Sequence, residues 1–216
     1  MSKNQVQITR NSTSKIEPFE TGETIILTGE ETELLYSLAS VLEYPTEDWY
    51  GTLERCKALS LLADRAGNEH FAEFCREIHE LPLVELQELY TRNFDLNPVC
   101  ALEVGYHLFG EDYKRGEFLA RLRESENPYE LGQAMQLPDF LPVVLRLMCK
   151  LDDAEERAGM IGYCLIPALN KMTEAFAKKT NPYGHLIRFV LETLKQIAEN
   201  SIKTTDETKE VRYQYA

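Results

Sequence analysis

The stretch of sequence that decides the fold runs from residue 185 to residue 200 and reads HLIRFVLETLKQIAEN. Its apolar residues recur at helical spacing, which places them on one face of an α-helix: Leu186, Ile187, Val190, Leu194 and Ile197. Charged residues lie off this stripe: Arg188, Glu192, Lys195 and Glu199. We expect this amphipathic helix to close a hydrophobic core.

The same helical spacing extends over most of the chain. An early helix is expected to end at Pro45, and its apolar face is formed by Leu34, Leu35, Leu38, Val41 and Leu42. Further helices are predicted over residues 47–66, 70–81, 84–96, 99–109, 112–125, 139–150, 153–178 and 185–200. No segment alternates apolar and polar residues as a strand would, so the predicted fold class is all-α, a single-domain helical bundle.

The two ends of the chain differ in composition from the region between them. Residues 1–29 are rich in Ser, Thr and Asn and contain Pro18 and Gly22, which predicts a flexible N-terminal arm. Residues 201–216 are similarly polar and are predicted to form a flexible C-terminal tail. The helical domain is therefore expected to span residues 30–200.

The chain is strongly acidic, with 36 acidic side chains, 23 basic ones and a formal net charge of −13. Residues 30–80 alone carry 12 acidic and four basic side chains, so much of the negative charge belongs to the expected helical domain. Nucleic acids and anionic membranes would be repelled by this charge, whereas a basic partner would be attracted. The charge therefore favours a basic partner.

Neither the N-terminal sequence nor the hydropathy pattern indicates a membrane protein. The first twenty residues lack the apolar region of a signal peptide, and no run of about 18 apolar residues occurs. We therefore expect a cytoplasmic protein. The cysteines, at positions 56, 75, 100, 149 and 164, form no C-x-x-C pair and are expected to be buried, reduced thiols.

The sequence contains no pattern that predicts catalysis. Motifs of the G-x-S-x-G type and glycine-rich phosphate loops are absent from it, so no enzyme activity is expected. His70, Cys75 and His79 fall on one predicted helix, but a metal site needs further ligands. His107 and His185 have no ligand spacing around them, so neither a metal nor another cofactor is predicted.

A first motif ends the predicted helix 84–96. Tyr90 and Phe94 are four residues apart and share a helix face, which core packing explains. Asp95 falls in the last turn, where the helix dipole disfavours a carboxylate by about 0.3–1 kcal/mol, so it should have a cationic partner. We hypothesise an ion pair with Arg115 that joins two helices. The alternative is that Asp95 stays open to receive a basic residue of a bound peptide.

A second motif is the run LPDFLP at residues 137–142, in which two prolines flank an aspartate just before an apolar helix. Asp139 is expected to be the N-cap of that helix, and Pro142 falls in its first turn, where the missing N–H costs little. Alternatively, this rigid turn exposes Phe140 and Leu141 at the lip of a groove for an apolar peptide.

Taken in order and spacing, these segments resemble the nitrate reductase delta-subunit family, the assembly chaperones of respiratory nitrate reductase, which are relatives of the chaperones for trimethylamine oxide and dimethyl sulfoxide reductases. The resemblance covers about residues 30–200 and is carried by YTRNFD at 90–95, HLFGED at 107–112, Arg115-Gly116 and LPDFLP at 137–142. It implies an all-helical single domain. Phe140 departs from the family pattern, since His or Tyr is expected there in many relatives.

The resemblance implies that the chain binds the N-terminal leader of a molybdoenzyme catalytic subunit and supports molybdenum cofactor insertion before membrane docking or twin-arginine export. The client would be a nitrate reductase or a related enzyme that acts on selenate, chlorate, dimethyl sulfide or a hydrocarbon. Peptide-binding or motif residues carried over by position are Tyr90, Phe94, Asp95, His107, Arg115, Leu137, Pro138, Asp139, Phe140, Leu141 and Pro142. The alternatives are a stable structural subunit of the oxidoreductase and a helical metal-dependent enzyme.

Overall fold

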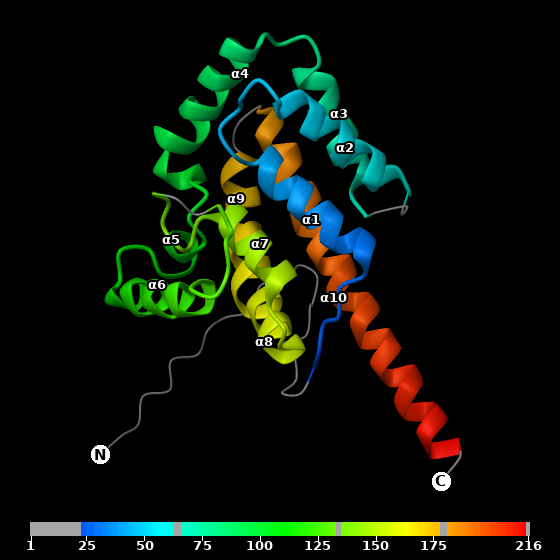
Figure 1. The fold of residues 1–216 in the computed structure, drawn as a ribbon. Coiled ribbons are helices and arrows are strands. Elements are labelled where there is room, and N and C mark those ends of the chain that lie inside the picture. Colours follow the sequence, from blue (N-terminus) through cyan, green and yellow to red (C-terminus); the bar gives the residue numbers. More distant parts are fainter. Residues whose placement is uncertain (1–22, 63–65, 133–134, 178–180, 215–216) are drawn as a thin grey trace.

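The structure, a computed structural model, describes residues 23–62, 66–132, 135–177 and 181–214, with side chains described as far as residue 201 in the last helix. These residues contain no strand and form a single helical body (Figure 1), which confirms the all-α prediction. The elements are α1 (Gly29–Val41), α2 (Trp49–Leu62), α3 (Asn68–Ile78), α4 (Leu83–Tyr90), η1 (Thr91–Asp95), η2 (Pro98–Cys100), α5 (Val104–Phe109), α6 (Tyr113–Glu126), α7 (Leu141–Lys150), α8 (Ala154–Gly159), η3 (Met160–Leu165), α9 (Ile166–Phe176) and α10 (Pro182–Gln214).

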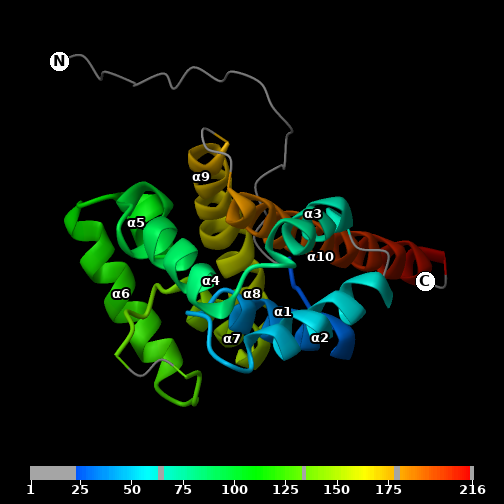
Figure 2. The same cartoon turned by 90° about the horizontal axis from the view of Figure 1, so that it is seen from above.

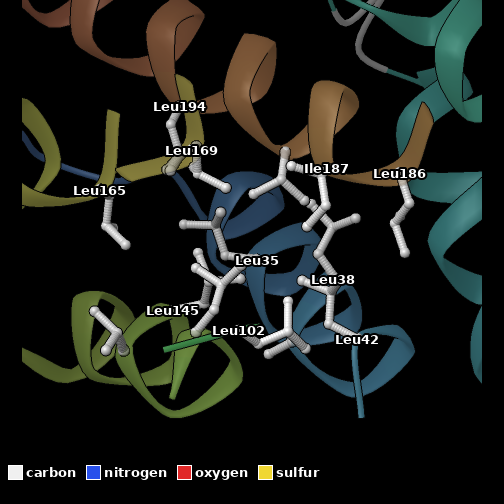
Figure 3. Close-up of a cluster of buried hydrophobic side chains, with 14 of the residues drawn as sticks. Leu35, Leu38, Leu42, Leu102, Leu145, Leu165, Leu169, Leu186, Ile187 and Leu194 are labelled. Carbon is white, nitrogen blue, oxygen red and sulfur yellow. The ribbon is translucent and has the colours of Figure 1, made fainter. Parts of the chain in front are cut away.

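The hydrophobic core lies between α1, α7, α9 and the first half of α10. Leucine side chains from these helices and from the segment before α5 converge in Figure 3. The apolar stripe of α10 is buried as expected, with every member at most 1% exposed: Leu186, Ile187, Val190, Leu194 and Ile197. Because full burial of a leucine or isoleucine side chain contributes about 1.5–3 kcal/mol, this stripe supplies a large part of the stability of the fold.

The chain enters the core before α1 begins. Ile25 is 1% exposed, its N–H donates to the Ala154 carbonyl at 3.0 Å, and Arg157 donates to the Ile25 carbonyl at 2.6 Å. Thr28 and Glu31 then form a capping box, in which each side chain accepts from the other's backbone N–H. Of the expected N-terminal arm, residues 1–22 lie outside the described part, and residues 23–28 pack on the helical body.

Helix α10 continues well beyond the expected end at residue 200. It runs to Gln214, so residues 201–214 of the expected C-terminal tail are helical, and the helix extends away from the other helices (Figure 1). No Pro or Gly follows Gly184, so nothing in the later sequence interrupts the helical hydrogen bonding. Within the described residues, no helix combines the length and apolarity that a bilayer-spanning segment requires.

Two predicted helices are interrupted by local structure. The helix expected over residues 99–109 begins only at Val104, because Pro98 starts the short 3₁₀ turn η2 and an extended segment follows it, with a single bridge from Glu103 to Phe140. The helix expected over 153–178 contains the π-helical turn η3 just before Pro167, which lacks the N–H that a regular helix would use. Helices α4, α5 and α6 gather on one side of the molecule, away from the C-terminal end of α10 (Figure 2).

Candidate functional site

The centre of the motif region is the side chain of Asp139, which is fully buried just before α7. Its Oδ2 atom accepts hydrogen bonds from the Gly105 N–H at 3.1 Å and from Arg115 Nε at 3.1 Å. The Arg115 Nη2 atom lies 3.1 Å from the same oxygen. This carboxylate therefore joins three segments: the turn before α7, the start of α5 and the first turn of α6.

The structure corrects the expected capping role of Asp139. The N-cap of α7 is Phe140, whose side chain makes no capping hydrogen bond, although Pro142 does lie in the first turn as expected. The turn is held instead by backbone hydrogen bonds, from Val104 N–H to the Asp139 carbonyl at 2.7 Å and from Leu141 N–H to the Leu102 carbonyl at 2.8 Å. Pairing with the 102–104 segment directs the Asp139 side chain inward, so it cannot reach the N–H groups of α7.

The proposed ion pair between Asp95 and Arg115 is also wrong. Arg115 pairs with Asp139, and Asp95 is an exposed residue for which no ion pair is found among the described residues. The physical reason is desolvation. A buried carboxylate without a cationic partner costs several kcal/mol, whereas an exposed one is solvated by water. The guanidinium therefore stays with the buried Asp139.

Burial raises the pKa of Asp139 and of two further carboxyl groups that feel its charge, Glu103 and Glu126. The charge of Asp139 adds to the rise in the pKa of Glu103 and of Glu126. Arg115 opposes the rise in the pKa of Asp139 and of Glu103. Its positive charge thus favours the burial of the Asp139 and Glu103 carboxylates.

The aromatic residues of the first motif are part of the core. Tyr90 donates its hydroxyl to the Leu42 carbonyl at 3.2 Å, and its ring lies 4.9 Å from that of Phe94. Phe94 in turn lies 4.8 Å from Tyr183 and 6.0 Å from Phe176. Both motif rings are buried, at 4% and 6% exposure, so the core-packing interpretation explains them.

His107 also forms contacts between separate elements of the fold. Its Nε2 atom lies 2.7 Å from the Ala101 carbonyl oxygen, and its own carbonyl accepts from Lys171 Nζ at 2.6 Å. Burial lowers the pKa of this histidine, so the ring is neutral at pH 7. The contacts tie α5 to α9 and to the extended segment before α5.

Most of the second motif is buried as well. Phe140 and Leu141 are not the exposed lip of a groove, since they are 8% and 0% exposed. Pro138 and Pro142 are buried too, and only Leu137 is well exposed. Of the peptide-binding or motif residues that the resemblance carried over by position, those that reach the surface are therefore Asp95, Leu137 and, in part, Arg115.

A solvent-facing surface next to the first motif was not identified from the sequence. It consists of exposed side chains on α4, η1, η2 and their junctions, which are apolar or acidic except for the basic Arg92. We call it the α4–η2 surface: Val84, Glu85, Glu88, Arg92, Asp95, Leu96 and Val99. The π turn η1 and the 3₁₀ turn η2 change the helical phase within this segment, so a regular helical pattern could not predict which side chains face outward. The only sequence signal was Asp95 itself.

Neither Cys149 nor Cys164 is an activated nucleophile. None of the five cysteines is in a disulfide among the described residues, and Cys56 and Cys100 are buried while the other three are half-buried. Burial raises the pKa of Cys164 to about 11 and that of Cys149 to about 12. These thiols are protonated at neutral pH and are poor nucleophiles.

The helices and the contacts of Asp139 define the structural class of the protein, a single-domain, all-helical protein. No protein-family model matches the chain. Curated relatives do match it. The probable nitrate reductase molybdenum cofactor assembly chaperone NarW of Escherichia coli K12 is 24% identical over 180 residues, which cover 83% of this chain and 74% of the relative.

The corresponding chaperone NarJ of Bacillus subtilis 168, also named as probable, is 26% identical over 166 residues, covering 74% of this chain and 88% of the relative. The nitrate reductase-like protein NarX of Mycobacterium tuberculosis is 28% identical over 177 residues, which are 79% of this chain and 26% of that longer protein. The chain is thus homologous to the nitrate reductase molybdenum cofactor assembly chaperones, the delta-subunit family, and the resemblance seen in its motifs is confirmed.

Proposed function

We propose that the chain is a cytoplasmic, non-enzymatic chaperone that binds the N-terminal leader of a molybdoenzyme catalytic subunit and supports insertion of the molybdenum cofactor before membrane docking or export. The observation that carries this proposal is its homology, over 83% and 74% of its length, to proteins named as assembly chaperones of nitrate reductase. A nitrate reductase is accordingly the first candidate client.

The α4–η2 surface is the proposed binding site for the leader. Leu96 is 74% exposed and Val99 is 59% exposed, so both side chains can bury apolar surface against a bound peptide. Asp95 and Glu88 lie beside them on the exposed side of the same segment. A leader that carries both basic and apolar residues would be steered by the acids and held by the apolar contacts.

The buried Asp139 and its partners Arg115 and Gly105 support this surface from inside the molecule and do not contact the peptide. Arg115 and Gly105 hold α6 and α5 against the turn before α7. The backbone pairing of residues 102–104 with that turn fixes the chain that follows η2. Asp95, freed of any role in pairing with Arg115, is left to receive a leader lysine or arginine.

Binding of a fluorescent synthetic leader, taken from the catalytic subunit of the same host, tests the proposal. We expect binding of about micromolar affinity or tighter that weakens as salt rises, because exposed charge pairs are screened. The double variant Leu96→Ser with Val99→Ser should weaken binding at least about tenfold, which corresponds to about 1.4 kcal/mol. The matched control is Leu61→Ser on α2, which removes a similarly exposed leucine (68%) far from this surface in sequence.

The control variant should bind as the unchanged chain does. Failure of both the leader peptide and the full catalytic subunit to bind would overturn the proposal. If the double variant and the Leu61→Ser control lose leader affinity equally, the α4–η2 surface is not the binding site.

A further inference from the structure

A group of metal-ligating side chains lies where α3 packs against the first turn of α10. Glu73 and Glu77 are one turn apart on α3, and His185 stands in the first turn of α10. One ligand atom from each of the three lies within 4.8 Å of the others, and all three side chains are half-buried. Sequence spacing could not reveal this group, because His185 is distant from the two glutamates along the chain.

A fourth side chain and an open hollow adjoin the group. His70 lies one turn before Glu73 on α3, and its ring centroid is 5.8 Å from that of His185. His70, Glu77 and His185 line a hollow of ≈ 200 Å³ that opens to solvent. An ion and a water molecule can therefore reach Glu77 and His185 through this hollow.

We propose that Glu73, Glu77 and His185 bind a first-row divalent cation of the zinc type, with His70 or water completing the coordination. Two carboxylates and an imidazole suit Zn²⁺, whereas Mg²⁺ and Ca²⁺ favour sites made of oxygen ligands alone. Ligand atoms about 2.0–2.2 Å from a tetrahedral zinc ion lie about 3.4 Å from each other. The three side chains must close together only slightly, which changes of side-chain rotamer can accomplish.

Two arginines face the same region and set the strength of the site. Arg76 donates to Glu73 at 3.0 Å, and Arg188 lines the hollow beside His185. Arg76 also contacts the second oxygen of Glu73, but the pair is exposed and screened by water, so an ion can displace it. Bound metal would then join α3 to α10, and the stability of the fold would rise with the logarithm of the metal concentration once that concentration exceeds the Kd.

Zinc titration of the full chain, freed of metal with a chelator, tests this proposal, which does not depend on leader binding. Calorimetry should show one Zn²⁺ per chain, little binding of Mg²⁺, and a rise in Tm with added Zn²⁺. His185→Gln and Glu77→Gln should each weaken Zn²⁺ binding at least about tenfold, since loss even of a group that supports a ligand costs about 10–100-fold. His79→Gln, an exposed histidine on the end of α3, is the matched control and should bind normally.

Cys75 requires a second control because thiols bind zinc and this one is half-buried on the same helix. Cys75→Ser should leave the affinity within about twofold of the unchanged chain. Absence of Zn²⁺ binding, unchanged affinity in His185→Gln, or loss of binding in Cys75→Ser or His79→Gln would each overturn the proposal. Leader binding by the metal-free chain tests the proposed function separately.

Discussion

Replacing Arg115 with Met tests the central claim that this side chain makes burial of Asp139 tolerable. Methionine retains an apolar stem but removes the charge and the donors that bind Asp139. The carboxylate would keep only the Gly105 N–H, because its Oδ1 atom has no hydrogen-bond partner. The variant should therefore leave a buried charge almost uncompensated.

The size of the effect follows from the geometry. Removing one partner of a buried ion pair costs about 3–5 kcal/mol, and the 23% exposure of the Arg115 side chain lets water replace part of the lost interaction. We expect the free energy of unfolding to fall by about 2–3 kcal/mol at pH 7. For a domain of this size the melting temperature should fall by about 4–12 °C.

The loss should also depend on pH. The pKa of Asp139 is already raised by burial, and removal of Arg115 removes an effect that lowers it. A carboxyl whose folded pKa is raised binds its proton more tightly in the folded state, so its contribution to stability is greatest in acid and declines as pH rises through the folded pKa. The deficit of the variant relative to the unchanged chain should therefore shrink when the pH is lowered from 7 to 5.

Urea denaturation followed by circular dichroism at both pH values measures these differences. Adding Asp139→Asn to Arg115→Met should recover at least about half of the loss, because the amide carries no charge to bury. Arg121→Met is the matched control on α6, since its pair with Glu117 is exposed, and should cost less than about 1 kcal/mol. A double variant no more stable than Arg115→Met, or a single variant as stable as the unchanged chain, would refute the reasoning.

Three further outcomes can be checked independently. Gly105→Ala should lower the free energy of unfolding by about 1–3 kcal/mol in urea denaturation, because the new Cβ would stand 2.7 Å from Asp139 Oδ2. The control Gly116→Ala has open space around the new Cβ and should be neutral or stabilising by up to about 1 kcal/mol. Arg157→Met should release the segment at Ile25, costing about 1–3 kcal/mol and speeding limited proteolysis there relative to Arg121→Met. Affinity purification from the host should recover the immature catalytic subunit; fixed stoichiometry with the mature complex would instead indicate a structural subunit.

The motif that carries the family resemblance serves mainly to build the fold. Phe140 and Leu141 enter the core, and Asp139 binds α5 and α6 to the turn before α7. Substitutions in this run should therefore lower stability first and leader binding only as a consequence. Substitutions at Leu96 and Val99, which lie at the surface, should do the reverse.

The sequence by itself determined the helical class, the buried face of α10, the aromatic pair and the acidic character of the chain. These properties depend on spacing along one helix or on composition, and both are local quantities. Tyr90 and Phe94, for example, share a face because four residues separate them, whatever the rest of the chain does.

Only the tertiary structure decided which partners meet across elements. In the folded chain Arg115 forms its ion pair with Asp139, and Asp95 remains exposed. The reason is that desolvation penalises an unpaired charge only where packing excludes water. The tertiary structure also brought His185 beside Glu73 and Glu77, from segments far apart in the sequence. Such choices depend on how helices pack around a shared core, which the spacing of residues within each helix does not specify.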